Sequence, residues 1–123
     1  MAKILVVEDE AAIANAYRIV LEQAGHEVTV VSDAKAALEV MAKAAPALIL
    51  LDIMMPEMSG LDFLSKLGAP KALGKTKVIA LSNIKTPDVV VAAGKLGVVD
   101  YLTKVDFTPH QVVEVVNQQL SGK

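Results

Sequence analysis

The chain contains no cysteine, which excludes a disulfide scaffold, a zinc site built on thiolates and a cysteine nucleophile. It also has little excess charge, since twelve basic residues face fourteen acidic ones and no basic patch forms, so nucleic acid is a poor candidate partner. Long hydrophobic runs are missing, and the stretch from Ala44 to Leu51 is too short to span a membrane.

The first residues do not have the pattern of a signal peptide. The apolar start from Met1 to Val7 meets three acids at once, in Glu8 to Glu10, and a signal peptide needs a longer apolar region and a cleavage site. We therefore expect a cytoplasmic protein that does not act at a membrane.

The chain has 123 residues, of which 54% are apolar and 21% charged. This length suits one domain, and the apolar fraction is enough to form a core, so disorder is not expected. Residues 1–123 are therefore predicted to form a single domain.

Short apolar runs alternate with longer segments of helical pattern. Runs that are apolar at every position are typical of strands buried in a parallel sheet; they are Ile4–Val7, Ala47–Leu51 and Val78–Leu81. Two more mixed runs, Val28–Val31 and Val98–Leu102, are predicted to be edge strands.

The segments between the strands carry helix signals. In the first, one apolar stripe is formed by Ile13, Tyr17, Val20, Leu21 and Ala24. Asp33 is predicted to cap the second helix, whose inner side would be Ala37, Leu38, Met41 and Ala44. The third begins near Gly60, with Leu61, Leu64 and Leu67 inside.

The rest of the chain is interpreted in the same way. Gly68 to Lys75 is expected to be a loop. Thr86 and Thr108, each followed by proline, are predicted to cap the last two helices, and Val90 and Val91 are placed off the inner stripe of the first of these. The order is five βα units, which predicts an open, doubly wound α/β sheet with helices on both faces.

Ligands of open α/β sheets bind beyond the carboxyl ends of the strands. The first strand is followed by Glu8 and Asp9, and the buried strands after it end at Asp52 and at Ser82. Lys104 follows the fifth strand. Three carboxylates, a hydroxyl and an ammonium group are therefore expected at one edge.

Oxygen ligands without imidazole or thiolate suit a hard cation such as Mg²⁺. A carboxylate beside such a metal can attack phosphorus, while a lysine and a serine can hold phosphoryl oxygens. Taken singly, each residue has a simpler interpretation: Glu8 and Asp9 as acids near a helix start, Asp52 as a turn cap, Ser82 as a loop hydroxyl and Lys104 as a surface lysine. Their convergence favours a site, because clustered carboxylates repel one another unless a cation lies among them.

Four blocks of this sequence, in order and at matching spacing, resemble the receiver domain of two-component response regulators over essentially the whole length. The blocks are Ile4–Asp9, Leu50–Gly60, Ala80–Ser82 and Asp100–Lys104. The resemblance implies a flavodoxin-like, five-stranded parallel sheet of order 2-1-3-4-5 and a phosphorylation-operated signalling switch.

The resemblance also implies a role for each site residue. Asp52 would accept the phosphoryl group from a phosphohistidine on a histidine kinase or a histidine phosphotransfer protein. Mg²⁺ would be bound by Asp9, by Asp52, by the backbone carbonyl of Met54 and, mainly through water, by Glu8. Ser82 and Lys104 would hold the phosphoryl oxygens, and Tyr101 would turn inward as Ser82 moves.

One departure from the family pattern, and the residue types at two positions that overhang the acceptor in this family, affect these expectations. Val105 stands where a proline usually follows the lysine, so the loop after Lys104 could take another path and change the reach of that side chain. Met54 and Ile84 would leave an apolar cover over the acceptor, which predicts slow loss of phosphate.

Other functions stay open at this point. A metal-dependent phosphohydrolase with an aspartyl phosphate would commonly need an acid at position 54, which is methionine. A degenerate receiver would serve only as an interaction module. The downstream partner is either a separate protein or a fused output domain, and the sequence does not separate these.

Overall fold

Five parallel strands form one sheet in the computed structural model, which describes residues 2–121. The strands are β1 (Lys3–Val7), β2 (Glu27–Val31), β3 (Leu48–Asp52), β4 (Lys77–Ser82) and β5 (Val98–Thr103). Their spatial order is β2-β1-β3-β4-β5, so the predicted order and the two predicted edge strands are confirmed.

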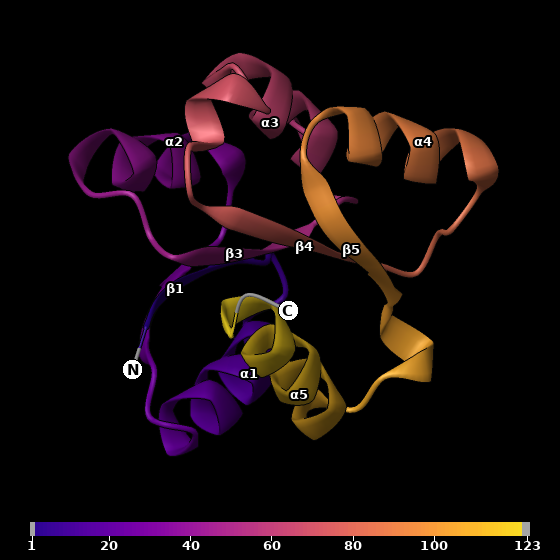
Figure 1. The fold of residues 1–123 in the computed structure, drawn as a ribbon. Helices are drawn as coiled ribbons and strands as arrows, with labels where there is room; N and C mark the ends of the chain where they lie inside the picture. The colour runs from indigo at the N-terminus through magenta and orange to yellow at the C-terminus, as the bar shows by residue number, and fades with distance from the viewer. Residues whose placement is uncertain (1, 122–123) are drawn as a thin grey trace.

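Five α-helices cover the two faces of the sheet, with α1 and α5 on one side and α2, α3 and α4 on the other (Figure 1). Their bounds are α1 (Ala11–Gln23), α2 (Ala34–Lys43), α3 (Gly60–Leu67), α4 (Pro87–Lys95) and α5 (Pro109–Leu120). Two short 3₁₀ helices, η1 (Lys71–Leu73) and η2 (Lys104–Asp106), lie in the connections.

Each face of the sheet has its own apolar core, because alternate residues of a strand point to opposite sides. On the α2–α3–α4 side, Leu5, Ile49 and Val78 pack with Phe63 of α3. On the other side, Ile4, Leu50 and Ile79 pack with residues of α1 and α5 that include Tyr17, Leu21 and Val112. The central strands are therefore buried on both faces, as their uninterrupted apolar runs indicate.

Side-chain caps begin several helices where the sequence predicts them. Asp33 Oδ1 accepts the N–H of Ala36 at 2.8 Å, and Thr108 Oγ1 accepts that of Gln111 at 3.2 Å. Thr86 Oγ1 accepts the N–H of Val89 at 3.4 Å. These bonds satisfy N–H groups that have no partner within their own helix.

Some packing predictions are wrong. Ala24 and Ala44 are exposed because their helices end before them, and the buried positions are Ala14 and Ala34 instead. The expected loop from Gly68 to Lys75 contains η1, whose Leu73 is 5% exposed. Val90 packs against the core on the α4 side, whereas Val91 is 56% exposed.

Within residues 2–121, none of the helices combines the length and the apolar character needed to cross a membrane.

Candidate functional site

Five polar residues from distant parts of the chain meet at the carboxyl edge of the sheet. Glu8 and Asp9 follow β1, Asp52 ends β3, Ser82 ends β4 and Lys104 begins η2 after β5. They meet because β1, β3, β4 and β5 are adjacent and parallel, so that their carboxyl ends lie together. The predicted convergence of these residues is therefore present in the fold.

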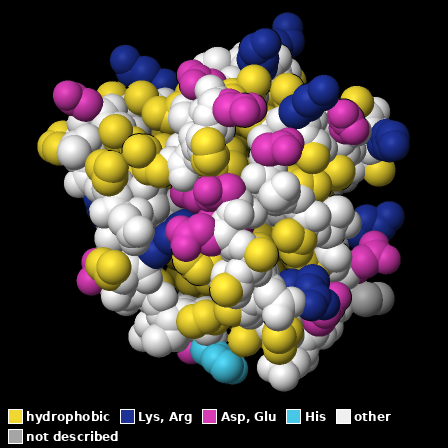
Figure 2. Space-filling model, turned by 180° about the vertical axis from the view of Figure 1, so that it is seen from behind, with side chains coloured by type: hydrophobic (Ala, Val, Ile, Leu, Met, Phe, Trp, Pro, Cys, Tyr) yellow, Lys and Arg dark blue, Asp and Glu magenta, His cyan; other side chains and the backbone are white. Residues whose placement is uncertain are grey.

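The acids differ in burial. Glu8 and Asp52 are 2% and 3% exposed, whereas Asp9 is exposed to solvent. One carboxylate oxygen from each of the three lies within 4.8 Å of the others. On the face of the molecule shown in Figure 2, acidic side chains gather near the centre while basic ones lie mostly toward the rim.

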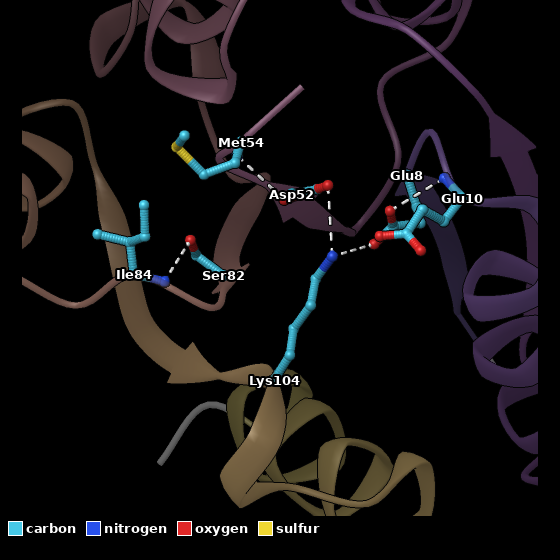
Figure 3. Close-up of polar contacts among 7 residues, drawn as sticks. All are labelled: Glu8, Glu10, Asp52, Met54, Ser82, Ile84 and Lys104. Atoms are coloured by element: carbon cyan, nitrogen blue, oxygen red, sulfur yellow. Dashed lines mark hydrogen bonds and ion pairs between the residues drawn. The ribbon is translucent and has the colours of Figure 1, made fainter. Parts of the chain in front are cut away.

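Lys104 joins the two buried acids. Its Nζ lies 2.6 Å from Glu8 Oε1 and 3.3 Å from Asp52 Oδ2 (Figure 3). The lysine side chain is itself only 10% exposed. Lys104 begins η2, in which Val105 is exposed. Valine in place of the usual proline at position 105 therefore does not prevent the lysine from reaching the acids.

The environment alters the protonation of this cluster. Burial raises the pKa of the Asp52 carboxyl to about 7, and the charge of Glu8 adds to this, while Lys104 and the Met54 N–H act in the opposite direction. For Lys104, burial lowers the pKa, but its hydrogen bond to Glu8 and the charges of Asp52 and Glu8 outweigh burial and leave the pKa above its usual value. Asp52 is thus a buried carboxylate whose negative charge is costly unless a cation compensates it.

The donor set fits a hard divalent cation. Three carboxylates within reach of a single ion, without imidazole or thiolate among them, are the oxygen ligands that Mg²⁺ or Ca²⁺ prefers. The exposure of Asp9 leaves the cluster open to solvent, which suits an ion that keeps some of its water ligands.

Backbone groups orient the two buried carboxylates. The N–H of Met54 donates to Asp52 Oδ1 at 3.0 Å, and the N–H of Glu10 donates to Glu8 Oε2 at 3.1 Å. The side chains of Met54 and Ile84 lie together on one side of the site and are 55% and 41% exposed (Figure 3). Apolar groups therefore flank Asp52 on the side away from Glu8.

Ser82 and Tyr101 meet at the chain segment after β4. Ser82 Oγ is fully buried and accepts the N–H of Ile84 at 3.1 Å. Tyr101 is 7% exposed, and its hydroxyl donates to the carbonyl of Ile84 at 2.5 Å. Tyr101 thus points inward, toward the main chain at Ile84.

Ser59 and Gly60, to which sequence reasoning gave no role at the site, begin α3 beside the end of β3. A Cβ on Gly60 would lie 2.6 Å from the carbonyl oxygen of Asp52, so only glycine lets α3 begin this close to the end of β3. Ser59 caps α3 in a reciprocal pair of hydrogen bonds with Asp62. The Ser-x-x-Asp spacing was a readable signal for this cap, whereas the contact at Gly60 has none.

The chain matches the family model described as the response regulator receiver domain over residues 4–117. Among curated relatives, it is 38% identical over 104 residues to sensory transduction protein RegX3 of Mycobacterium tuberculosis, covering 85% of this chain and 44% of that protein. It is 36% identical over 118 residues to the DNA-binding response regulator MtrA of the same organism, covering 96% and 50%. The chain therefore spans about half the length of the curated relatives it matches.

Solved structures show the same fold. A CheY-like response regulator receiver domain protein from Methanospirillum hungatei superposes with a TM-score of 0.91 at 26% identity, covering 99% of this chain and 95% of that one. The receiver domain of Francisella response regulator 1452 gives a TM-score of 0.86 at 30% identity, with 98% of both chains covered. By its sequence and its fold, the chain belongs to the response regulator receiver domain family, whose members are signalling switches of two-component systems.

Proposed function

We propose that residues 1–123 act as one receiver domain that takes a phosphoryl group onto Asp52. The observation that carries the proposal is the position of Asp52, buried at the end of β3 beside the acids after β1 and in contact with the ammonium group of Lys104. A carboxylate in these surroundings is held next to both a cation-binding cluster and a group that can neutralise a phosphoryl oxygen.

The proposed donor is a phosphohistidine on a histidine kinase or a histidine phosphotransfer protein. A carboxylate oxygen of Asp52 forms a bond to phosphorus as the bond from phosphorus to the histidine nitrogen breaks, and the imidazole keeps that electron pair. Lys104 and the hydroxyl of Ser82 would then bind phosphoryl oxygens. Lys104 Nζ already lies 3.3 Å from Asp52 Oδ2. It would have to move only from this oxygen to an oxygen of the phosphoryl group bound to the same carboxylate.

We propose Mg²⁺ as the cofactor, held by Asp9, Asp52 and the backbone carbonyl of Met54, with Glu8 acting mainly through water. When bound, the ion offsets the negative charge that collects around the phosphoryl group. Support comes from the three carboxylates within 4.8 Å of one another. The N–H of Met54 donates to Asp52, which brings the main chain at residue 54 beside the acceptor.

The output would be a change at the surface of α4, β5 and α5 that a protein target or a fused output domain detects. MtrA, which is named a DNA-binding response regulator, is about twice as long as this chain, and we propose a comparable arrangement as one way in which the signal is used. We place the domain in the cytoplasm, with a switching role and slow self-dephosphorylation. A phosphohydrolase is disfavoured, because position 54 carries an apolar side chain where a general acid would be needed.

The test is the intact mass of the protein after incubation with acetyl phosphate and Mg²⁺. We expect the mass to increase by one phosphoryl group in the wild-type chain and in Asp88→Ala, which removes an exposed acid outside the site. We expect no increase in Asp52→Ala or when Mg²⁺ is chelated. A wild-type chain that gains no mass, from this donor or from a phosphorylated histidine domain, would be a degenerate receiver and would overturn the proposal.

A further inference from the structure

A second hollow lies at the amino edge of the sheet, opposite the phosphoryl site. It has a volume of ≈ 710 Å³ and lies between the start of β1, the segment before β3 and the turn after η1. Its apolar lining residues include Ala45, Pro46, Ala47 and Leu73. A neighbouring hollow of ≈ 440 Å³ shares residues 73–76 with it and continues to Gly97. The two form one surface, which we call the amino-edge groove.

The walls of this groove are held in a defined shape. Thr76 Oγ1 is buried and donates to the carbonyl of Pro46 at 2.7 Å, which ties the two sides of the groove together. At the far end, a Cβ on Gly97 would lie 2.9 Å from a methyl group of Leu73, so the chain there is in close contact with η1. These two contacts hold the connecting segments that line the groove against each other.

The charged residues that line the groove are all lysines. The sequence between Asp62 and Asp88 contains five lysines and no acidic residue, although the whole chain has a net charge of −2. Lys3, Lys75 and Lys77 line the groove, and no aspartate or glutamate does. Lys71 belongs to η1 beside it.

Two of these lysines have no competing partner. Among residues 2–121, neither Lys71 nor Lys75 forms an ion pair, and both are exposed. Lys77 already has a partner, because its Nζ donates to the carbonyl of Gln119 near the end of α5. Lys3 also has one, since its Nζ lies 4.0 Å from Glu27 Oε2. An acidic ligand would therefore be bound mainly by Lys75, which lines the groove, with Lys71 of the adjoining η1 as a second cation beside it.

We propose that the amino-edge groove binds an acidic peptide segment of a partner protein that inserts an apolar side chain between the lysines. The apolar lining would contact the apolar side chain, and the lysines would attract the acidic residues of such a segment. A nucleic acid is disfavoured, because the groove has no arginine to bind phosphate bidentately and no aromatic ring on which a base could stack.

The groove and Asp52 lie at opposite edges of the sheet, so the proposal does not depend on phosphorylation. The probe is a blocked peptide with a pair of leucines between short runs of glutamate, titrated into the ¹⁵N-labelled chain. We expect amide shifts at residues 45–47 and 73–76, and equal affinity in Asp52→Ala. Added salt should weaken binding, because Lys71 and Lys75 are exposed to solvent.

Charge reversal tests the lysines. We expect Lys71→Glu combined with Lys75→Glu to weaken peptide binding by at least about tenfold, because two attractive charges become repulsive. The matched control is Lys35→Glu combined with Lys85→Glu, which changes two exposed lysines outside the groove by the same charge and should leave the affinity unchanged.

The other outcomes reject the proposal. If both double variants lost the same affinity for the peptide, binding would reflect general charge attraction. The same would follow if a peptide with alanines in place of the leucines bound as tightly as the leucine peptide. Tighter binding to anionic vesicles or to duplex DNA, with the same dependence on Lys71 and Lys75, would assign the groove to a different partner. Circular dichroism of each variant must first show the wild-type fold. Ala45→Asp changes an exposed residue of the lining and should also weaken peptide binding, and unchanged affinity in this variant would overturn the proposal.

Discussion

Ser82 and Tyr101 both form hydrogen bonds with the main chain of Ile84. Ser82 Oγ accepts the N–H of Ile84, while the Tyr101 hydroxyl donates to its carbonyl. A movement of Ser82 toward a phosphoryl group on Asp52 would break the first bond, so the main chain at Ile84 connects the site to the β5 surface. This link gives a physical route for the proposed switch.

We predict that a beryllofluoride mimic bound with Mg²⁺ changes the backbone NMR shifts of residues 82–84 and of Tyr101. In Tyr101→Phe, the shifts near Asp52 should persist while those on α4 and β5 become smaller, because the hydrogen bond to Ile84 is absent. The loss of that bond should also lower the free energy of unfolding by about 1 kcal/mol. Shifts confined to the metal site in the wild-type chain would contradict a switch.

The ion pair of Lys104 and Glu8 should contribute to stability. We expect Lys104→Met to lower the free energy of unfolding at neutral pH by about 3 kcal/mol, because Glu8 and Asp52 would be left buried without a cation. Urea denaturation measures this, with the exposed Lys35→Met as the control. In the double variant with Glu8→Gln the loss should be smaller than in Lys104→Met alone. A loss that instead equals the sum of the two single losses would mean that the pair is not coupled.

Asp52 should make the metal-free protein less stable as the pH rises. Its pKa is about 7 in the folded state against 3.8 without the fold, so the folded state holds the proton more tightly. The contribution of Asp52 to stability is therefore greatest below about pH 4 and falls until about pH 7, above which it is constant. Lys104 stays charged throughout this range.

Asp52→Asn removes this titration. In chelator, we expect the variant to exceed the wild type above pH 7 by up to about 4 kcal/mol, with the difference shrinking toward pH 4. Urea denaturation across this pH range is the measurement. A difference that is the same at all pH values would show that the charge of Asp52 is not its cause.

Mg²⁺ should stabilise the domain through Asp9. At about a hundred times its dissociation constant, a ligand that binds only the folded state adds about 2.7 kcal/mol. We expect this gain in the wild type, a smaller gain at lower pH as protons compete for the carboxylates, and none in Asp9→Ala. Because Asp9 is exposed, its removal should leave the metal-free fold intact. Unfolding of Asp9→Ala would instead make this carboxylate structural.

The phosphorylated state should be long-lived. Met54 and Ile84 flank Asp52 with apolar side chains, and neither can orient a water molecule for attack on phosphorus. We expect Met54→Asn combined with Ile84→Glu to lose phosphate faster, as measured by the decay of the phosphorylated mass. Decay at the wild-type rate would show that water access at these positions does not set the lifetime.

The sequence alone determined the element order and most of the site. Uninterrupted apolar runs such as Val78–Leu81 occur where both faces of a strand are buried, and the threonine–proline pairs at Thr86 and Thr108 act within their own turn, so both signals are local. The meeting of Glu8, Asp52 and Lys104 also followed from the sequence, because parallel strands place their carboxyl ends at one edge.

The tertiary structure decided what depends on contacts between distant segments. Three findings depend on how close separate elements come: Leu73 is buried, Val90 packs inward and Gly60 touches the carbonyl of Asp52. No local pattern encodes that distance. The same holds for the bond of Lys104 to Glu8 and for the inward position of Tyr101. Residue types and their order place chemical groups at an edge, but only the packing of the helices on the sheet decides which of those groups touch.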